Sequence, residues 1–104
     1  MSAIRIVAAV TAILPVVLAP FAARADAAAG ERLARQWCAN CHVVDGGNAA
    51  TTVPQGPPTF HVVAGRLNPD QLRTFLSHPH PPMPDLALSR IEINDLIAYI
   101  ETLR

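Results

Sequence analysis

Residues 38–42 read Cys38-Ala39-Asn40-Cys41-His42, and the interpretation of the whole chain starts from this stretch. Two thiols three residues apart lie on one side of a helical turn, and an imidazole follows directly. Both sulfurs can therefore bond to one edge of a flat ligand while the imidazole reaches a metal ion at its centre. The stretch predicts a metal-containing prosthetic group held by Cys38, Cys41 and His42.

In an exported chain, the Cys-x-x-Cys-His pattern is typical of covalent haem attachment. Three alternatives compete with it. A disulfide between Cys38 and Cys41 would close a loop too short to stabilise much, and a thioredoxin-like redox pair would need a βαβ pattern. Zinc would need further ligands from His61, His78 or His80, which lack regular zinc-site spacing. We therefore expect one covalently attached haem c, containing iron.

Residues 1–25 have the three-part layout of a secretory signal peptide. A short basic start precedes an apolar run over residues 6–22, and Ala23 and Ala25 supply the small residues before a cleavage site. The alternative is an uncleaved membrane anchor, but the run is barely long enough to span a bilayer and two prolines interrupt it. We expect cleavage after Ala25, which leaves residues 26–104 as one periplasmic domain without stable membrane insertion.

The expected mature chain, residues 26–104, is short and poor in aromatic residues, so it needs something besides its own side chains to complete a core. It carries eight acidic residues, six arginines and no lysine, which gives a formal charge of −2. There is no basic stripe and none of the common nucleic-acid motifs. Nucleic acid is therefore excluded as an expected partner.

Helical patterns dominate the mature chain, and no segment alternates like a strand. The first segment is rich in good helix formers, and loop composition follows it. Gly65 is expected to close a short second segment, while capping boxes at Asn68 and Ser89 open the last two. The sequence thus predicts an all-α fold of three to four short helices. The predicted helices span residues 27–38, 60–64, 69–78 and 90–104.

Residues 26–104 resemble a small bacterial class I cytochrome c over essentially their whole length. A second point of resemblance is Gly30, which lies eight residues before Cys38. The family has a glycine at this place in its first helix, where it allows close contact with the last helix. Pro58 resembles the family proline whose carbonyl accepts a hydrogen bond from the haem-ligating histidine, and Pro57 is an almost equal candidate. The resemblance implies the cytochrome c fold, with the helices wrapped around one haem.

The last helix is similar to the family's in carrying the apolar and aromatic pair Leu96 and Tyr99. One departure concerns Ala34, which stands where the family often has an aromatic residue. We expect Trp37 to take over part of that packing. The lysine-rich face of the mitochondrial protein is missing, so its partners are not carried over.

The resemblance also places Met83 in the family's axial-methionine loop. Methionine and histidine are the usual sixth ligands of haem in cytochromes. Met83 is the sole methionine of residues 26–104, and a proline on each side stiffens its loop. We expect Met83 as the sixth ligand, with His80 as the first rival. The roles of His61, His78 and His80 stay open.

Two axial ligands from the protein would leave the iron no open position for a substrate, so electron transfer rather than catalysis is expected. The expected protein is a periplasmic carrier of single electrons between redox proteins, with a dehydrogenase as donor and an oxidase or reductase as acceptor. The alternative is a haem subunit bound permanently to a periplasmic dehydrogenase. A gas-binding or peroxidatic haem protein is a third interpretation, and it requires Met83 to be labile.

Overall fold

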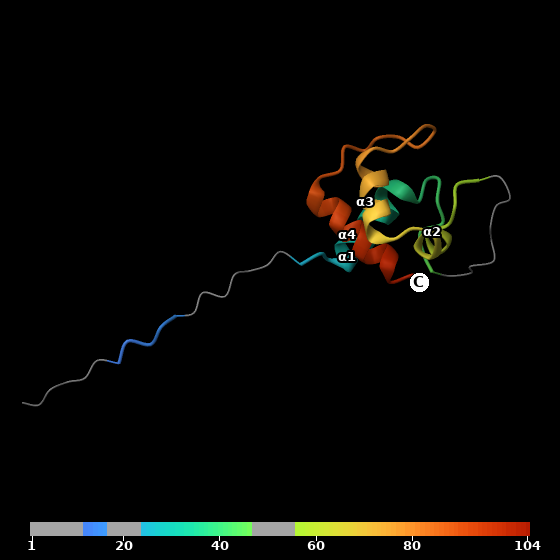
Figure 1. Cartoon of the computed structure of the whole chain (residues 1–104). Coiled ribbons are helices and arrows are strands. Elements are labelled where there is room, and N and C mark those ends of the chain that lie inside the picture. The colour runs from blue at the N-terminus through green and yellow to red at the C-terminus, as the bar shows by residue number, and fades with distance from the viewer. Residues whose placement is uncertain (1–11, 17–23, 47–55) are drawn as a thin grey trace, which may run out of the picture.

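The computed structural model describes residues 12–16, 24–46 and 56–104 (Figure 1). Within these ranges the regular secondary structure is helical and contains no strand, which confirms the predicted fold class. None of the helices described has the length and apolar character that a membrane crossing needs. The predicted signal peptide falls mostly on residues 1–11 and 17–23, outside the described residues, so it stays a prediction.

The first helical segment consists of α1, Ala27–Leu33, and the π-helix η1, Ala34–Cys38. Asp26 caps α1, because its carboxylate accepts hydrogen bonds from two backbone nitrogens of the first turn. In η1 the chain winds more widely, and the backbone nitrogen of Ala39 donates to the carbonyl of Ala34 at 3.0 Å. The predicted helix therefore does extend to Cys38, but its last turn is not an α-helix.

Three further helices complete the fold: α2, Phe60–Arg66; α3, Pro69–Ser77; and α4, Arg90–Glu101. Asn68 and Ser89 form the two predicted capping boxes, each with both reciprocal hydrogen bonds present. The helix starts are thus set by local sequence, and both capping predictions are confirmed.

Two predicted helix ends are wrong. Gly65 does not close α2, because the backbone nitrogen of Leu67 donates to the carbonyl of Val63 at 2.9 Å and helical bonding continues to Arg66. A Cβ on Gly65 would meet no atom within 4 Å, so no close packing requires a glycine there. The last helix, α4, ends at Glu101 instead of the C-terminus.

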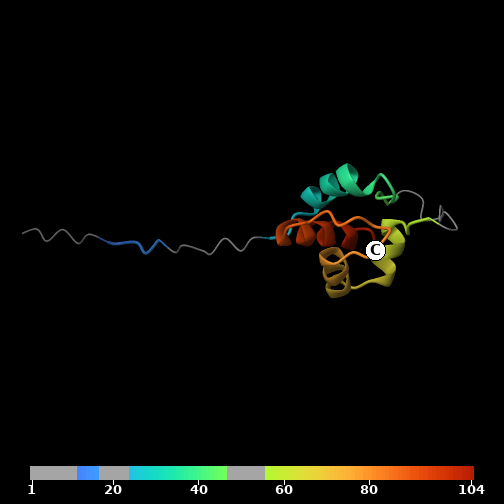
Figure 2. The ribbon, with the colours of Figure 1, turned by 90° about the horizontal axis from the view of Figure 1, so that it is seen from above.

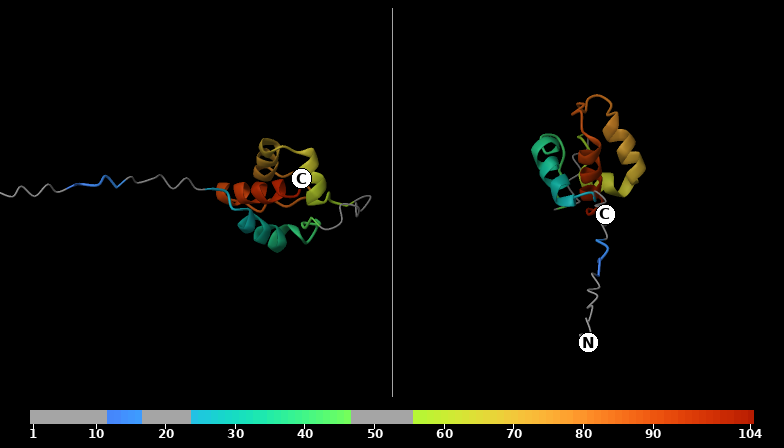
Figure 3. Two further views of the ribbon diagram at one scale, coloured as in Figure 1. Left: turned by 90° about the horizontal axis from the view of Figure 1, so that it is seen from below. Right: turned by 90° about the vertical axis from the view of Figure 1, so that its left-hand side faces the viewer.

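Helix α4 is the central element of the fold. In Figure 2, α1 and η1 lie on one side of α4, and α2 and α3 lie on the other. Figure 3 shows the same order from below and from the side. Each of α1, α2 and α3 contacts α4 directly. The buried apolar core is Ala34, Val44, Phe60, Ala64, Leu72, Ile93, Leu96, Ile97, Tyr99 and Ile100.

The closest approach of α1 to α4 is at Gly30. A Cβ on this residue would lie 1.9 Å from the carbonyl oxygen of Asp95 and 2.5 Å from its carbonyl carbon. No side chain fits there, which confirms the predicted role of Gly30. The predicted pair on the last helix is also buried, with Leu96 at 1% and Tyr99 at 6% exposure.

The prediction for Trp37 is wrong. Its side chain is 51% exposed and lies outside the core. Ala34 is itself fully buried, since its small side chain fits where the first helical segment packs against the core. The wide turn of η1 begins at Ala34, and Trp37 lies at the surface beside Leu86 and Leu88.

Candidate functional site

The cysteine motif occupies the turn that ends η1. The backbone nitrogens of Cys41 and His42 both donate to the carbonyl of Cys38, at 3.1 and 2.9 Å. This tight turn keeps the three side chains close along the chain. Cys38 is half-buried and Cys41 is exposed, and no disulfide joins them. Burial raises the pKa of the Cys38 thiol above its ordinary value.

His42 is held from behind by a backbone carbonyl. Its Nδ1 lies 2.7 Å from the carbonyl oxygen of Pro58, an atom that can only accept, so Nδ1 carries the proton and donates. The carbonyl in contact belongs to Pro58 and not to Pro57, which resolves the choice that the sequence left open. With Nδ1 protonated, Nε2 of the neutral imidazole keeps its lone pair and is the nitrogen able to bind a metal.

The loop that carries Pro58 is tied to the chain beyond His42. The backbone nitrogen of Phe60 donates to the carbonyl of Val43 at 2.9 Å. The Phe60 ring lies 5.7 Å from the imidazole of His42, measured between ring centroids and tilted by 58°. Thr59 is buried and caps α2 through Val62. These contacts fix the orientation of the His42 ring.

Tyr99 connects this loop to α4. Its hydroxyl donates to the carbonyl of Val44 at 2.6 Å, and its ring lies 6.4 Å from that of Phe60. Burial, together with the nearby Glu31 carboxylate, raises the pKa of Tyr99, so the hydroxyl stays protonated and remains a donor. Sequence reasoning recognised Tyr99 as a packing residue but missed this bond, which joins residues far apart in the chain.

Met83 is in the loop between α3 and α4. Its side chain is half-buried, and its backbone nitrogen donates to the carbonyl of His80 at 3.2 Å. The Nδ1 of His80 donates to the carbonyl of Pro81 at 3.0 Å, and its ring meets the edge of Phe75 at 5.2 Å. Figures 1 and 2 place the tip of this orange loop and the green segment after η1 toward the same end of the helical body.

Hydrogen bonds therefore bring together four of the five predicted site residues, namely Cys38, Cys41, His42 and Pro58. Met83 belongs to a separate loop whose hydrogen bonds are local. The loop is shaped by Asp85, whose carboxylate accepts from the backbone nitrogen of Ala87 at 2.8 Å. Ala87 has a φ of 50°, in the left-handed region that few residues other than glycine adopt.

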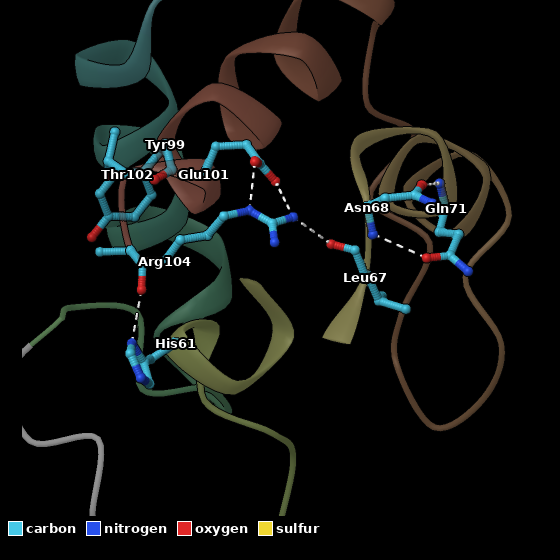
Figure 4. A network of polar contacts seen from close by, with 9 residues as sticks. His61, Leu67, Asn68, Gln71, Tyr99, Glu101, Thr102 and Arg104 are labelled. Carbon is cyan, nitrogen blue, oxygen red and sulfur yellow. Dashed lines mark hydrogen bonds and ion pairs between the residues drawn. The ribbon is translucent and has the colours of Figure 1, made fainter. Parts of the chain in front are cut away.

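His61 has a structural contact away from the cysteine motif. Its half-buried ring donates from Nδ1 to the carbonyl of Leu103 at 2.7 Å. Figure 4 shows this bond beside a second one, in which Arg104 donates to the carbonyl of Leu67 at 3.0 Å while also pairing with Glu101. These contacts attach the C-terminal residues to α2 and to Leu67, the residue that follows it. They favour a packing role for His61.

Two open cavities are lined by residues other than the predicted site residues. One, of about 520 Å³, follows the outer side of α3, and the other, of about 210 Å³, lies at the surface beside Trp37. Neither is lined by a residue of the cysteine motif or by Met83. The first is lined by Leu67, Asn68, Asp70, Gln71, Thr74, Phe75 and His78, and the second by Trp37, Leu86, Ala87, Leu88 and Glu92.

The alternatives to haem fit this geometry less well. Cys38 and Cys41 do not form a disulfide, and the described chain has no strand for a thioredoxin-like unit. Within residues 12–16, 24–46 and 56–104, no three His, Cys, Asp or Glu side chains gather in a way that could hold a metal ion. A single imidazole with its Nδ1 hydrogen-bonded, next to two free thiols, is a donor set that suits haem c.

Comparison with known proteins agrees with this donor set. Residues 25–100 match the family model described as cytochrome C oxidase, cbb3-type, subunit III. The chain is also 46% identical over 82 residues to cytochrome c-552 of Bradyrhizobium diazoefficiens, covering 77% of each chain. The chain belongs to the cytochrome c family. No solved structure matches it.

Membership defines the cofactor and the general function of this cytochrome. Cytochromes c carry covalently attached haem c with iron and transfer electrons between redox partners. The protein is accordingly an electron-transfer haem protein.

Proposed function

We propose that residues 26–104 form a periplasmic carrier of single electrons, with haem c bonded to Cys38 and Cys41 and with His42 and Met83 as the axial ligands. The main support is the 2.7 Å hydrogen bond from Nδ1 of His42 to the Pro58 carbonyl, because it orients the ring and leaves Nε2 as the ligating atom. Iron in bound haem supplies reversible one-electron oxidation and reduction.

Each residue has a distinct task in this proposal. The two cysteine sulfurs anchor the cofactor covalently, so it stays with the chain in either oxidation state. The Pro58 carbonyl makes the His42 imidazole more basic by accepting a hydrogen bond from its Nδ1–H group. The Met83 thioether would be the second protein ligand of the iron and would keep small molecules away from it. With both ligands supplied by the protein, the iron would transfer electrons and bind no substrate.

We also propose export to the periplasm with cleavage after Ala25. The basic start, apolar run and small residues of positions 1–25 support this. A further support is that every helix of the described chain lies in residues 27–101, with Asp26 as the cap of the first. Removal of the leader would therefore leave those helices intact.

Replacement of Met83 tests the carrier function. In Met83→Ala the weak iron–sulfur charge-transfer band of the oxidised protein should vanish, and the reduced protein should bind carbon monoxide. The reduction potential should fall on the order of a hundred millivolts, since axial ligands act within a range of about 0.8 V.

His80→Ala is the matched control, because His80 lies in the same loop and is the first rival ligand. The His80→Ala variant should keep the iron–sulfur charge-transfer band and should not bind carbon monoxide. If His80→Ala abolishes the band while Met83→Ala preserves it, the ligand assignment is wrong. If the native protein already binds carbon monoxide readily, Met83 does not block the iron, and the proposed carrier function is contradicted.

A haem subunit of a larger oxidoreductase is the second candidate. The family model that matches residues 25–100 is described as a subunit of an oxidase, which favours this candidate. Size-exclusion chromatography of the native protein from its own host separates the two. A monomeric peak supports the free carrier, whereas a stable complex with a catalytic chain supports the subunit.

A further inference from the structure

The start of the fold places a backbone nitrogen against a carboxylate of another helix. The nitrogen of Asp26 donates to Oδ1 of Asp95 at 2.7 Å, from the residue before α1 to the middle of α4. The carboxylate of Asp26 also lies here, accepting from the nitrogens of Ala28 and Ala29 at 2.9 and 3.1 Å. Two negative charges thus gather around one neutral N–H group.

This is the nitrogen that cleavage after Ala25 would release. We propose that the released α-ammonium of Asp26 forms an ion pair with Asp95, so that removal of the leader completes the contact between α1 and α4. The inference depends on the proposed cleavage site and is independent of the haem ligands.

The position of the nitrogen makes this pair stronger than an ordinary surface ion pair. A lysine must give up side-chain freedom to hold its ammonium in place, which cancels most of the gain. Here the nitrogen belongs to the backbone, and the carbonyl of Asp26 accepts from Gly30 at 3.0 Å, so the group is already fixed. Gly30 in turn packs directly on the backbone of Asp95, which holds the two helices in register.

A charge on this nitrogen improves the electrostatics of the contact. The bond already has an ionised acceptor, and a positive charge on the donor adds direct Coulomb attraction to the Asp95 carboxylate. The half-buried Asp95 carboxylate and the Asp26 carboxylate both stabilise the ammonium, so the pKa of the α-amine is higher in the folded chain than in the unfolded chain. The added stability is full below the unfolded pKa, about 8, and is lost as the pH rises through the folded value.

The sequence allows a clean chemical test. Residues 26–104 contain no lysine, so the α-amine of the processed holoprotein is its sole primary amine. Acetylation removes the charge but keeps an N–H donor, whereas reductive dimethylation keeps the charge and one N–H donor. Comparing the two products on the native chain isolates the charge without any mutation.

We expect acetylation to lower the melting temperature of the native holoprotein by about 2–5 °C at pH 7 and low salt, and dimethylation to leave it almost unchanged. In D95N, acetylation should have little effect. The amine should also react about three- to tenfold more slowly with an acetylating reagent in the native protein than in D95N. D45N is the matched control, because it removes a carboxylate from the loop whose Val44 carbonyl is bonded to Tyr99 and takes no part in the contact between Asp26 and Asp95.

Equal acetylation rates in native protein and D95N, or an equal loss of melting temperature in both, would overturn the ion pair. Mass spectrometry of the purified protein checks the starting point. A first residue other than Asp26 overturns the inference together with the cleavage site, and the haem spectrum then still tests electron transfer separately. A first residue at Asp26 with no effect of D95N overturns the ion pair alone.

Discussion

Replacing Gly30 by alanine should destabilise the protein severely for so small a change. The new Cβ would lie 1.9 Å from the carbonyl oxygen of Asp95 and 3.0 Å from the nitrogen of Leu96. Both atoms belong to the backbone of α4, so neither can rotate away. Ordinary contact begins near 3.4 Å, which means that α1 must retreat from α4 by about 1.5 Å.

The clash must be weighed against the better helix propensity of alanine. Overpacking of a core costs about 1–3 kcal/mol, and a contact with an immovable backbone belongs at the upper end. Alanine stabilises a helix by about 1 kcal/mol relative to glycine, which offsets part of this cost. The net loss is about 2 kcal/mol, which for a domain of this size lowers the melting temperature by about 8–16 °C.

Gly65→Ala provides the matched control, since Gly65 is also inside a helix but its Cβ would meet nothing within 4 Å. At that position only helix propensity changes, so the free energy of unfolding should rise by about 1 kcal/mol. Guanidinium unfolding of both holoprotein variants, followed by helical circular dichroism, gives the two changes with opposite signs. A Gly30→Ala protein as stable as the native one would refute the close packing of α1 on α4.

Two further changes test the support of the site. Tyr99→Phe deletes the hydroxyl that donates to the carbonyl of Val44 at 2.6 Å and leaves that buried carbonyl without its donor. The free energy of unfolding, measured in guanidinium, should fall by about 1–1.5 kcal/mol. An unchanged midpoint would show that this bond does not hold the loop. Ser89→Ala removes the cap of α4 and should lower the free energy of thermal unfolding by about 1 kcal/mol, whereas Ser89→Asp should keep the cap and the stability. Equal stability of the two Ser89 variants would contradict the capping role.

Local sequence signals predicted the elements of this fold well. The boxes at Asn68 and Ser89 depend on side chains three residues apart, so the sequence alone was sufficient to place both helix starts. The end of α2 could not be predicted in the same way. A glycine permits a helix to end but does not force it, and the bond from Leu67 to Val63 carries the helix past Gly65.

The site shows the same division between local and distant contacts. Cys38, Cys41 and His42 lie within one turn of chain, so their spacing alone was sufficient to propose them as a site. The choice between two adjacent proline carbonyls depended on how Thr59 caps α2 and how Phe60 bonds to Val43. The bond between Phe60 and Val43 joins residues that are distant in the chain, and no sequence pattern records such a pairing.

Peptide mapping of the attached cofactor tests the central claim most directly. Arginine-specific cleavage should release residues 36–66 as one peptide, since Arg35 and Arg66 bound it and no arginine or lysine lies between. After acid–acetone extraction, the haem mass should stay on this peptide, with no thiol at Cys38 or Cys41 left to alkylate. Loss of the haem in the solvent, or recovery of both cysteines as free thiols, would contradict the account.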